Sequence, residues 1–260
     1  MSYLVDYHMH TTFSDGKDSY QSYLESARKK DLAEIGFTDH LTLAPVDWCV
    51  DEKDYPVMKE NLRNLCNNFS EDVQVRFGLE VDYFPDKEEA LSQLIAYFPV
   101  DYVIGSVHFI DDWNFDTDRS LYGKWSNDTL YQMYFERVQQ AAKSRLFDVI
   151  GHFDLIKKLN CWPESDQTHL FEASLKVLKE ADVVMELNTS GLDRPCHEFF
   201  PSKQILEMAA KIGVPVTLGS DAHMPAQVGR HFETAIAMLK EVGYTKIIRF
   251  RNRQRGEIRI

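Results

Sequence analysis

Residues 214–223 read VPVTLGSDAH, a short β-branched and apolar run that ends in a glycine, a carboxylate and an imidazole. Residues 225–242 then have helical spacing, and Pro225 is well placed for a first helical turn. A short apolar run is typical of a strand buried in a parallel sheet, and the following helix provides the crossover to the next strand. This stretch therefore predicts one strand–helix unit of an α/β fold.

The same unit recurs along the chain. Further apolar runs lie at about 3–7, 34–37, 73–81, 101–106, 147–150, 183–187 and 245–250. Segments with helical spacing lie between them at 19–30, 55–69, 88–97, 129–144, 168–179 and 202–211. About seven repeats favour a parallel sheet with crossover helices, and a length of 260 residues favours one closed barrel as a single domain over 1–260. An open doubly wound sheet is the alternative, but no glycine-rich phosphate loop follows an early strand.

The chain is acidic, with 29 Lys and Arg against 41 Asp and Glu and a formal net charge of −12. A field of this sign disfavours nucleic acid as a partner. No secretory signal or membrane-length apolar stretch is present, and the four cysteines form no C-x-x-C pair. We therefore expect a cytoplasmic protein with reduced thiols and no membrane partner. The basic run at 249–260 is expected to be an exposed terminal strand or tail.

Chemistry in a parallel barrel gathers at the carboxyl ends of the strands. Six of the eight apolar runs place an imidazole or a carboxylate at this end. The candidate metal ligands are His8, His10, Asp15, His40, Glu80, His108, His152, Asp221 and His223. One divalent ion such as zinc takes about four to six donors, so this set predicts two or three divalent ions.

A single histidine at the end of a strand is more often structural than a metal ligand. Nine such groups clustered at one water-poor end of a barrel do not fit a structural role, because burial of each charge would cost several kcal/mol without compensating cations. Asp39 and Asp154 are expected either to be structural or to accept a hydrogen bond from a ligand imidazole.

The motifs resemble the polymerase-and-histidinol-phosphatase (PHP) superfamily of metal-dependent phosphoesterases, over residue 3 to about 235. The resemblance is carried by six ordered segments: DYHMHT at 6–11 with SDG at 14–16, GFTDH at 36–40, GLE at 78–80, GSVH at 105–108, GHFD at 151–154 and GSDAH at 219–223. Residues 106–116 and 186–202 further resemble the stand-alone histidinol-phosphatases of this superfamily.

The resemblance implies a distorted (β/α)7 TIM-like barrel with a trinuclear metal centre at the carboxyl ends of its strands. One ion would be held by His8, His10, Glu80 and Asp221, a second by Glu80, His108 and His152, and a third by Asp15, His40 and His223. Some members of the superfamily have His where this chain has Asp15. A carboxylate there favours a harder ion, so manganese or iron could replace zinc.

The expected activity is hydrolysis of L-histidinol phosphate to L-histidinol and phosphate in histidine biosynthesis, by attack of a hydroxide that bridges the metals. Asp221 is the candidate to orient this hydroxide and take its proton, and Asp15 or His223 could relay a proton to the leaving oxygen. Lys158 and Arg194 are candidates to bind the phosphate, although exposed bases are common.

Discrimination for this substrate needs an acidic group near its amine and a polar or aromatic wall near its imidazole. The loop after His108 offers Asp116 with Trp113 and Phe115, although these aromatic residues could equally pack the loop itself. The expected partner is thus a small phosphate ester, and the sequence indicates no oligomeric state.

Two other functions fit the motifs. The first is a PHP phosphodiesterase or nuclease acting on nucleotides or short RNA, against which the charge of −12 counts. The second is an inactive module that supports a polymerase, but no polymerase segment is attached and no ligand position is visibly lost.

Overall fold

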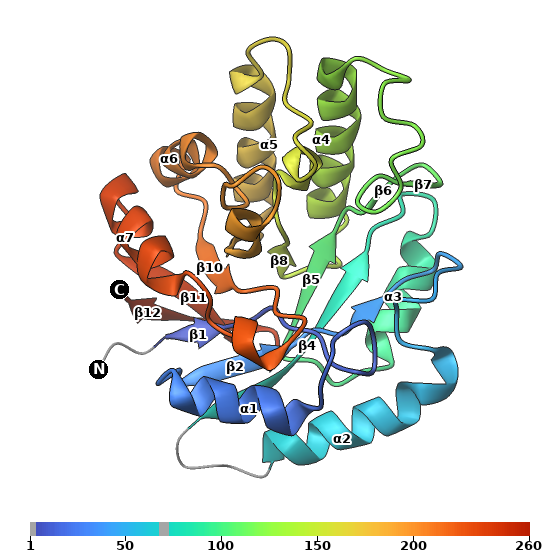
Figure 1. The fold of residues 1–260 in the computed structure, drawn as a ribbon, viewed down its shortest axis with the longest axis vertical. Coiled ribbons are helices and arrows are strands. Elements are labelled where there is room, and N and C mark those ends of the chain that lie inside the picture. The colour runs from blue at the N-terminus through green and yellow to red at the C-terminus, as the bar shows by residue number, and fades with distance from the viewer. Residues whose placement is uncertain (1–3, 68–72) are drawn as a thin grey trace.

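The computed structural model describes residues 4–67 and 73–260 (Figure 1). Residue 3 of the first expected strand and residues 68 and 69 of the second expected helix lie outside this part of the chain. Within the described residues, seven parallel strands follow one another in the order β1 (Val5–Asp6), β2 (Glu34–Phe37), β4 (Gln74–Asp82), β5 (Tyr102–Ser106), β8 (Val149–Ile150), β9 (Val184–Asn188) and β10 (Val216–Gly219).

Main-chain hydrogen bonds bring the two edges of this sheet together. The amide of Tyr7 donates to Leu218 O at 3.0 Å, and the amide of His10 donates to Ala222 O at 2.9 Å. The buried carboxylate of Asp6 reinforces this seam by accepting from the amide of Ser220 at 2.8 Å. The expected seven-stranded barrel is therefore confirmed, in a nearly closed form, and the open doubly wound sheet is excluded.

Helices surround the strands in Figure 1. They are α1 (Tyr20–Lys29), α2 (Tyr55–Asn67), α3 (Glu88–Ala96), α4 (Asn127–Lys143), α5 (Thr168–Ala181), α6 (Lys203–Ile212) and α7 (Phe232–Val242). Two of them show ordinary capping chemistry. The Ser126 side chain accepts from the amide of Thr129 at the start of α4, and Gly213 ends α6 with a φ of 81°.

The prediction that a helix begins at Pro225 is wrong. Residues Pro225–Gln227 form only a 3-10 turn, η4, and α7 begins at Phe232. Gly229 and His231 between them have φ values of 61° and 58°. A right-handed helix cannot contain these left-handed conformations, so the chain turns before the helix starts.

Short elements cover the carboxyl end of the barrel. They are β3 (His40–Leu41), η1 (Glu52–Asp54), β6 (Phe109–Ile110), β7 (Trp113–Asn114), η2 (Leu155–Lys157) and η3 (Ser190–Asp193). Of these, β3 pairs with the end of β4 in the register His40 to Glu80. This register sets two candidate ligands side by side.

The basic terminal run forms a strand rather than a tail. It belongs to an antiparallel hairpin of β11 (Lys246–Arg251) and β12 (Gln254–Arg259). Phe250 stacks on Tyr102 at 5.4 Å between ring centroids, and Arg253 pairs with Asp148 at 2.9 Å. The hairpin therefore packs on the barrel at the end opposite the candidate ligands.

No helix within the described residues is both long enough and apolar enough to cross a membrane.

The amino end of the barrel is filled by a tyrosine and a buried ion pair. The hydroxyl of Tyr102 donates to Tyr7 O at 2.7 Å, and a Cβ at Gly36 would lie 2.0 Å from that hydroxyl oxygen. Glycine at position 36 thus makes room for the ring. Nearby, Arg76 donates to the two carboxylate oxygens of the fully buried Glu34 at 2.9 and 2.8 Å, and the Tyr7 hydroxyl also donates to Glu34.

Removing the guanidinium takes away the cation that pairs with the buried Glu34 carboxylate. Arg76→Met should lower the free energy of unfolding by about 3–5 kcal/mol, as measured by urea denaturation. The double variant Glu34→Gln, Arg76→Met should recover much of this loss, because a neutral amide needs no cation. A single variant within about 1 kcal/mol of the wild type would show that the ion pair is not an important constraint.

Candidate metal centre

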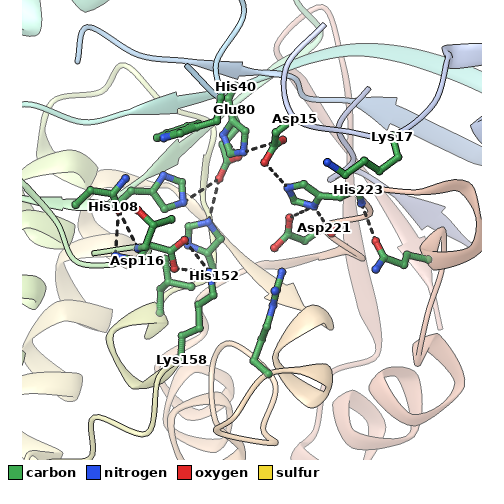
Figure 2. A pocket seen from close by; sticks show the side chains of 16 residues that line it. Asp15, Lys17, His40, Glu80, His108, Asp116, His152, Lys158, Asp221 and His223 are labelled. Atoms are coloured by element: carbon green, nitrogen blue, oxygen red, sulfur yellow. Dashed lines mark hydrogen bonds and ion pairs between the residues drawn. The ribbon is translucent and has the colours of Figure 1, made fainter. Parts of the chain in front are cut away.

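The nine candidate ligands converge at the carboxyl end of the barrel, as the labelled members in Figure 2 show. The carboxylate of Glu80, on β4, lies at their middle. Among the described residues, five imidazoles have a ring nitrogen within 3.8 Å of its oxygens. The distances to Glu80 are 3.2 Å from His8 Nε2, 3.5 Å from His10 Nε2, 2.7 Å from His40 Nδ1, 3.8 Å from His108 Nε2 and 2.9 Å from His152 Nε2.

Two further carboxylates border this cluster. Asp221 Oδ1 lies 3.4 Å from His10 Nε2 and 3.5 Å from His223 Nδ1. Asp15 lies 3.2 Å from His223 Nε2 and 3.7 Å from His40 Nε2. The structure thus brings every predicted metal ligand into one continuous group.

Ligand atoms within 4.8 Å of one another form three groups in the described residues: His10, Asp15, His40 and His223; His8, His10 and Glu80; and His40, Glu80 and His108. These groups overlap the ligand sets implied by the resemblance without separating them, because His10 and His40 each belong to two. The assignment of each residue to one ion stays a prediction.

The unpartnered polar atoms of these residues fit a metal centre. In the described part of the chain, several buried ring and carboxylate atoms have no hydrogen-bond partner: His8 Nε2, His10 Nδ1 and Nε2, Asp15 Oδ1 and His152 Nδ1. Among them, His8 Nε2 and His10 Nε2 lie 3.2 and 3.5 Å from Glu80 Oε2. Unpaired buried polar atoms are costly, and cations bound between them would supply the missing partners.

The electrostatics of the ligands agree with this reading. Burial, together with His40 and His223, lowers the pKa of His10 to about 3, so its imidazole is neutral, as a metal ligand must be. Burial alone would raise the pKa of Glu80, but His40 and His8 hold it well below its ordinary value. Glu80 therefore stays a carboxylate in its buried position.

Two carboxylates that carried no expected role contact ligand imidazoles. Glu186 on β9 lies 2.6 Å from His8 Nδ1, and Asp82 at the end of β4 lies 2.7 Å from His108 Nδ1. Each turns the other ring nitrogen, Nε2, towards the cluster. An acidic residue inside an apolar run was the available sequence signal for Glu186.

Asp39 and Asp154 do not contact an imidazole, which corrects one of their two expected roles. Asp39 accepts from the amide of Thr11 at 2.6 Å and the hydroxyl of Ser14 at 2.8 Å, so it orders the loop that carries Asp15. Asp154 pairs with Lys157 Nζ at 2.7 Å. Both residues are structural supports of the loops around the site.

A cavity of about 400 Å³ opens beside the cluster. Besides seven of the nine ligands, it is lined by Lys17, Trp48, Asn114, Asp116, Thr117, Leu155, Lys158, Arg194 and Gln227. The expected substrate residues Lys158 and Asp116 form an ion pair at 2.6 Å, and the Nε of Arg194 is buried with no hydrogen-bond partner in the described residues. Lys158 also lowers the pKa of Asp116, against the effect of its burial.

The expected aromatic walls are not in this cavity. Trp113 is buried, donates to Asp118 O at 2.9 Å and packs on Tyr122, while Phe115 is fully buried beneath the same loop. This placement does not fit a substrate contact for Trp113. The aromatic side chain that lines the cavity is Trp48, whose ring meets His40 edge-on at 4.8 Å between centroids. Nothing in its sequence context distinguished it.

The chain matches two family models, the PHP domain over residues 6–190 and a PHP-associated region over 202–238. A protein of Deinococcus radiodurans named probable histidinol-phosphatase is 32% identical over 260 residues, covering 98% of this chain and 99% of that protein. The histidinol-phosphatase of Bacillus subtilis is 26% identical over 88% of this chain and 96% of its own.

A solved structure has the same fold. The histidinol phosphate phosphatase of Lactococcus lactis, in complex with zinc, L-histidinol and phosphate, superposes with a TM-score of 0.83 at 22% identity over 97% of this chain and 98% of its own. The match of the PHP domain model to most of the chain, together with the full-length relative from Deinococcus, shows that this protein belongs to the PHP family.

Proposed function

We propose that this protein is a metal-dependent phosphomonoesterase that hydrolyses L-histidinol phosphate to L-histidinol and phosphate. The observation that carries the proposal is the group of nine candidate ligands with Glu80 at its middle, which opens directly into a cavity with Lys158 and Arg194 on its wall. The names of the full-length relatives give the substrate. The comparison with the zinc, histidinol and phosphate complex supports the fold that such a site requires.

Two or three divalent ions, zinc, manganese or iron, would be held by the nine ligands and would supply an activated water and positive charge around the phosphoryl oxygens. We propose that Asp221 orients the attacking water and accepts its proton. The Ser190 hydroxyl donates to its Oδ2 at 3.0 Å and so restrains the carboxylate. Asp15 and His223, partly exposed at the mouth and 3.2 Å apart, are the proposed relay of a proton to the leaving oxygen.

We propose that the cavity wall has a phosphate side and an amine side. Arg194 brings an unpartnered buried Nε, which suits a phosphoryl oxygen. Asp116 and Lys158 form an ion pair. We propose that Lys158 contacts the phosphate and that Asp116 contacts the substrate amine. Trp48 takes the place expected for Trp113 as the aromatic wall for the imidazole.

The nuclease alternative is not favoured. A nuclease needs a long basic or aromatic groove, whereas the observed cavity holds about 400 Å³ and the chain carries a net charge of −12.

Metal removal and a panel of esters test the activity. Zinc- or manganese-loaded protein should release phosphate from histidinol phosphate much faster than from nucleoside monophosphates or oligonucleotides, and dialysis against a chelator should abolish turnover until metal is restored. The double variant His8→Asn, His10→Asn should be inactive, while His169→Asn on the exposed face of α5 should match the wild type. Faster hydrolysis of an oligonucleotide would reverse the assignment.

Replacing the phosphate-side cations should weaken substrate binding. Arg194→Met or Lys158→Met should each lower kcat/KM about 10- to 100-fold, the equivalent of one hydrogen bond to a charged group. Inhibition by inorganic phosphate should weaken in parallel. Lys211→Met, at an exposed position of α6, is the matched control. Unchanged phosphate inhibition in Arg194→Met would place the phosphate elsewhere.

Trp48 should affect the choice of leaving group rather than the chemistry. Trp48→Ala should lower kcat/KM for histidinol phosphate about 3- to 10-fold, in line with the loss of one aromatic contact, and leave phosphoethanolamine hydrolysis nearly unchanged. Trp48→Phe should retain most of the preference. Trp162→Ala, at an exposed tryptophan outside the cavity, serves as control. Equal losses on both esters would show that Trp48 has no role in selectivity.

A further inference from the structure

Glu186 is a buried carboxylate outside the candidate ligand set and outside the cavity lining. No Lys or Arg of the described residues forms an ion pair with it. Its hydrogen-bond partners are His8, the main-chain amide of His152 and the side-chain amide of Asn188. A Cβ at Gly219 would lie 1.9 Å from Glu186 Oε1, so the neighbouring strand β10 leaves a space that only glycine permits. The barrel is thus shaped to hold this side chain.

One oxygen of Glu186 fixes the ring of His8. Oε1 lies 2.6 Å from His8 Nδ1, and a carboxylate there accepts a hydrogen bond from the Nδ1–H group. The other nitrogen, Nε2, then presents its lone pair to the cluster, 3.2 Å from Glu80 Oε2. This Nε2 is buried and has no hydrogen-bond partner in the described residues, as a nitrogen kept for a cation would be.

The second oxygen fixes the main chain of His152. Oε2 accepts from the His152 amide at 2.8 Å. His152 has a φ of 21°, in the left-handed half of conformational space that residues other than glycine seldom adopt. The surrounding structure must hold such a residue in place, and the carboxylate that orients His8 shares this task with the Tyr134 hydroxyl, which donates to His152 O at 3.2 Å. His152 Nε2 then lies 2.9 Å from Glu80 Oε1.

We infer that Glu186 is a positioning residue that couples two subsites of the metal centre, the one served by His8 and the one served by His152. The inference rests on the metal centre of the proposed function, but not on the identity of the substrate. Asp82 provides the contrast inside the same site, because its recorded partner is the single imidazole of His108. Loss of Glu186 should therefore disturb two ions, and loss of Asp82 only one.

The test is a metal-binding measurement on the full-length protein. Zinc content after dialysis, competition with a chelator and the absorption spectrum of the cobalt-loaded protein are measured for Glu186→Ala, Asp82→Asn and the exposed control Glu180→Gln. Glu186→Ala should lose about 10- to 100-fold in affinity for two ions, Asp82→Asn for one, and Glu180→Gln for none. The cobalt spectrum should change in Glu186→Ala at each of the two affected sites.

Glu186→Gln keeps the shape of the side chain if the alanine variant does not fold. Its amide has one acceptor oxygen for donors that both carboxylate oxygens serve in the wild type, so at least one subsite should still weaken. Loss of a single ion in Glu186→Ala, or wild-type affinities in both Glu186 variants, would overturn the coupling. Because these readouts require no turnover, a failure to hydrolyse histidinol phosphate would count against the proposed function alone.

Discussion

The burial of Glu80 among five imidazoles is the constraint on which the rest of this structure depends. These imidazoles come from the segments after β1, β5 and β8 and from β3, so they meet only if the barrel closes in the observed register. Closure in turn depends on the seam between β1 and β10, where the buried Asp6 carboxylate accepts from Ser220. The fold and the site are therefore one problem of register: a shift by one residue would turn these side chains to the opposite face.

The two ends of the barrel differ in packing and in backbone strain. At the amino end, Tyr102, the Glu34–Arg76 pair and the terminal hairpin pack tightly. At the carboxyl end, His152 and Asp221 have φ values of 21° and 52°, which are unfavourable for residues with a side chain. Strain of this kind persists only where the surroundings fix it, so the dense amino end stabilises a scaffold that can hold strained ligands at the other end.

Much of this arrangement could be predicted, because the residues that follow the apolar runs of parallel strands all lie at the carboxyl end of the barrel. That rule selected most of the candidate ligands, and the alternation of apolar runs with helical segments predicted the barrel. The same rule does not predict the hydrogen-bond partner of a carboxylate in a loop. Asp39 accepts from Thr11 rather than from an imidazole, a contact that this rule does not indicate. The rule also could not separate Trp113, packed inside its loop, from Trp48, which lines the cavity, because both are aromatic residues in loops after strands. The start of α7 depended on the left-handed His231, which no apolar spacing reveals.

The charge of the cavity links substrate binding to metal binding. Asp15, Glu80, Asp116 and Asp221 line it, against the cationic Lys17, Lys158 and Arg194. Lys158 is already matched by Asp116, so the protein alone offers a dianionic ester little net attraction, on a chain of net charge −12. Cations held among the candidate ligands would reverse that sign beside the proposed position of the phosphate. Ions in this site would thus contribute to affinity as well as to chemistry, and by linkage a bound phosphate ester would strengthen the retention of the ions.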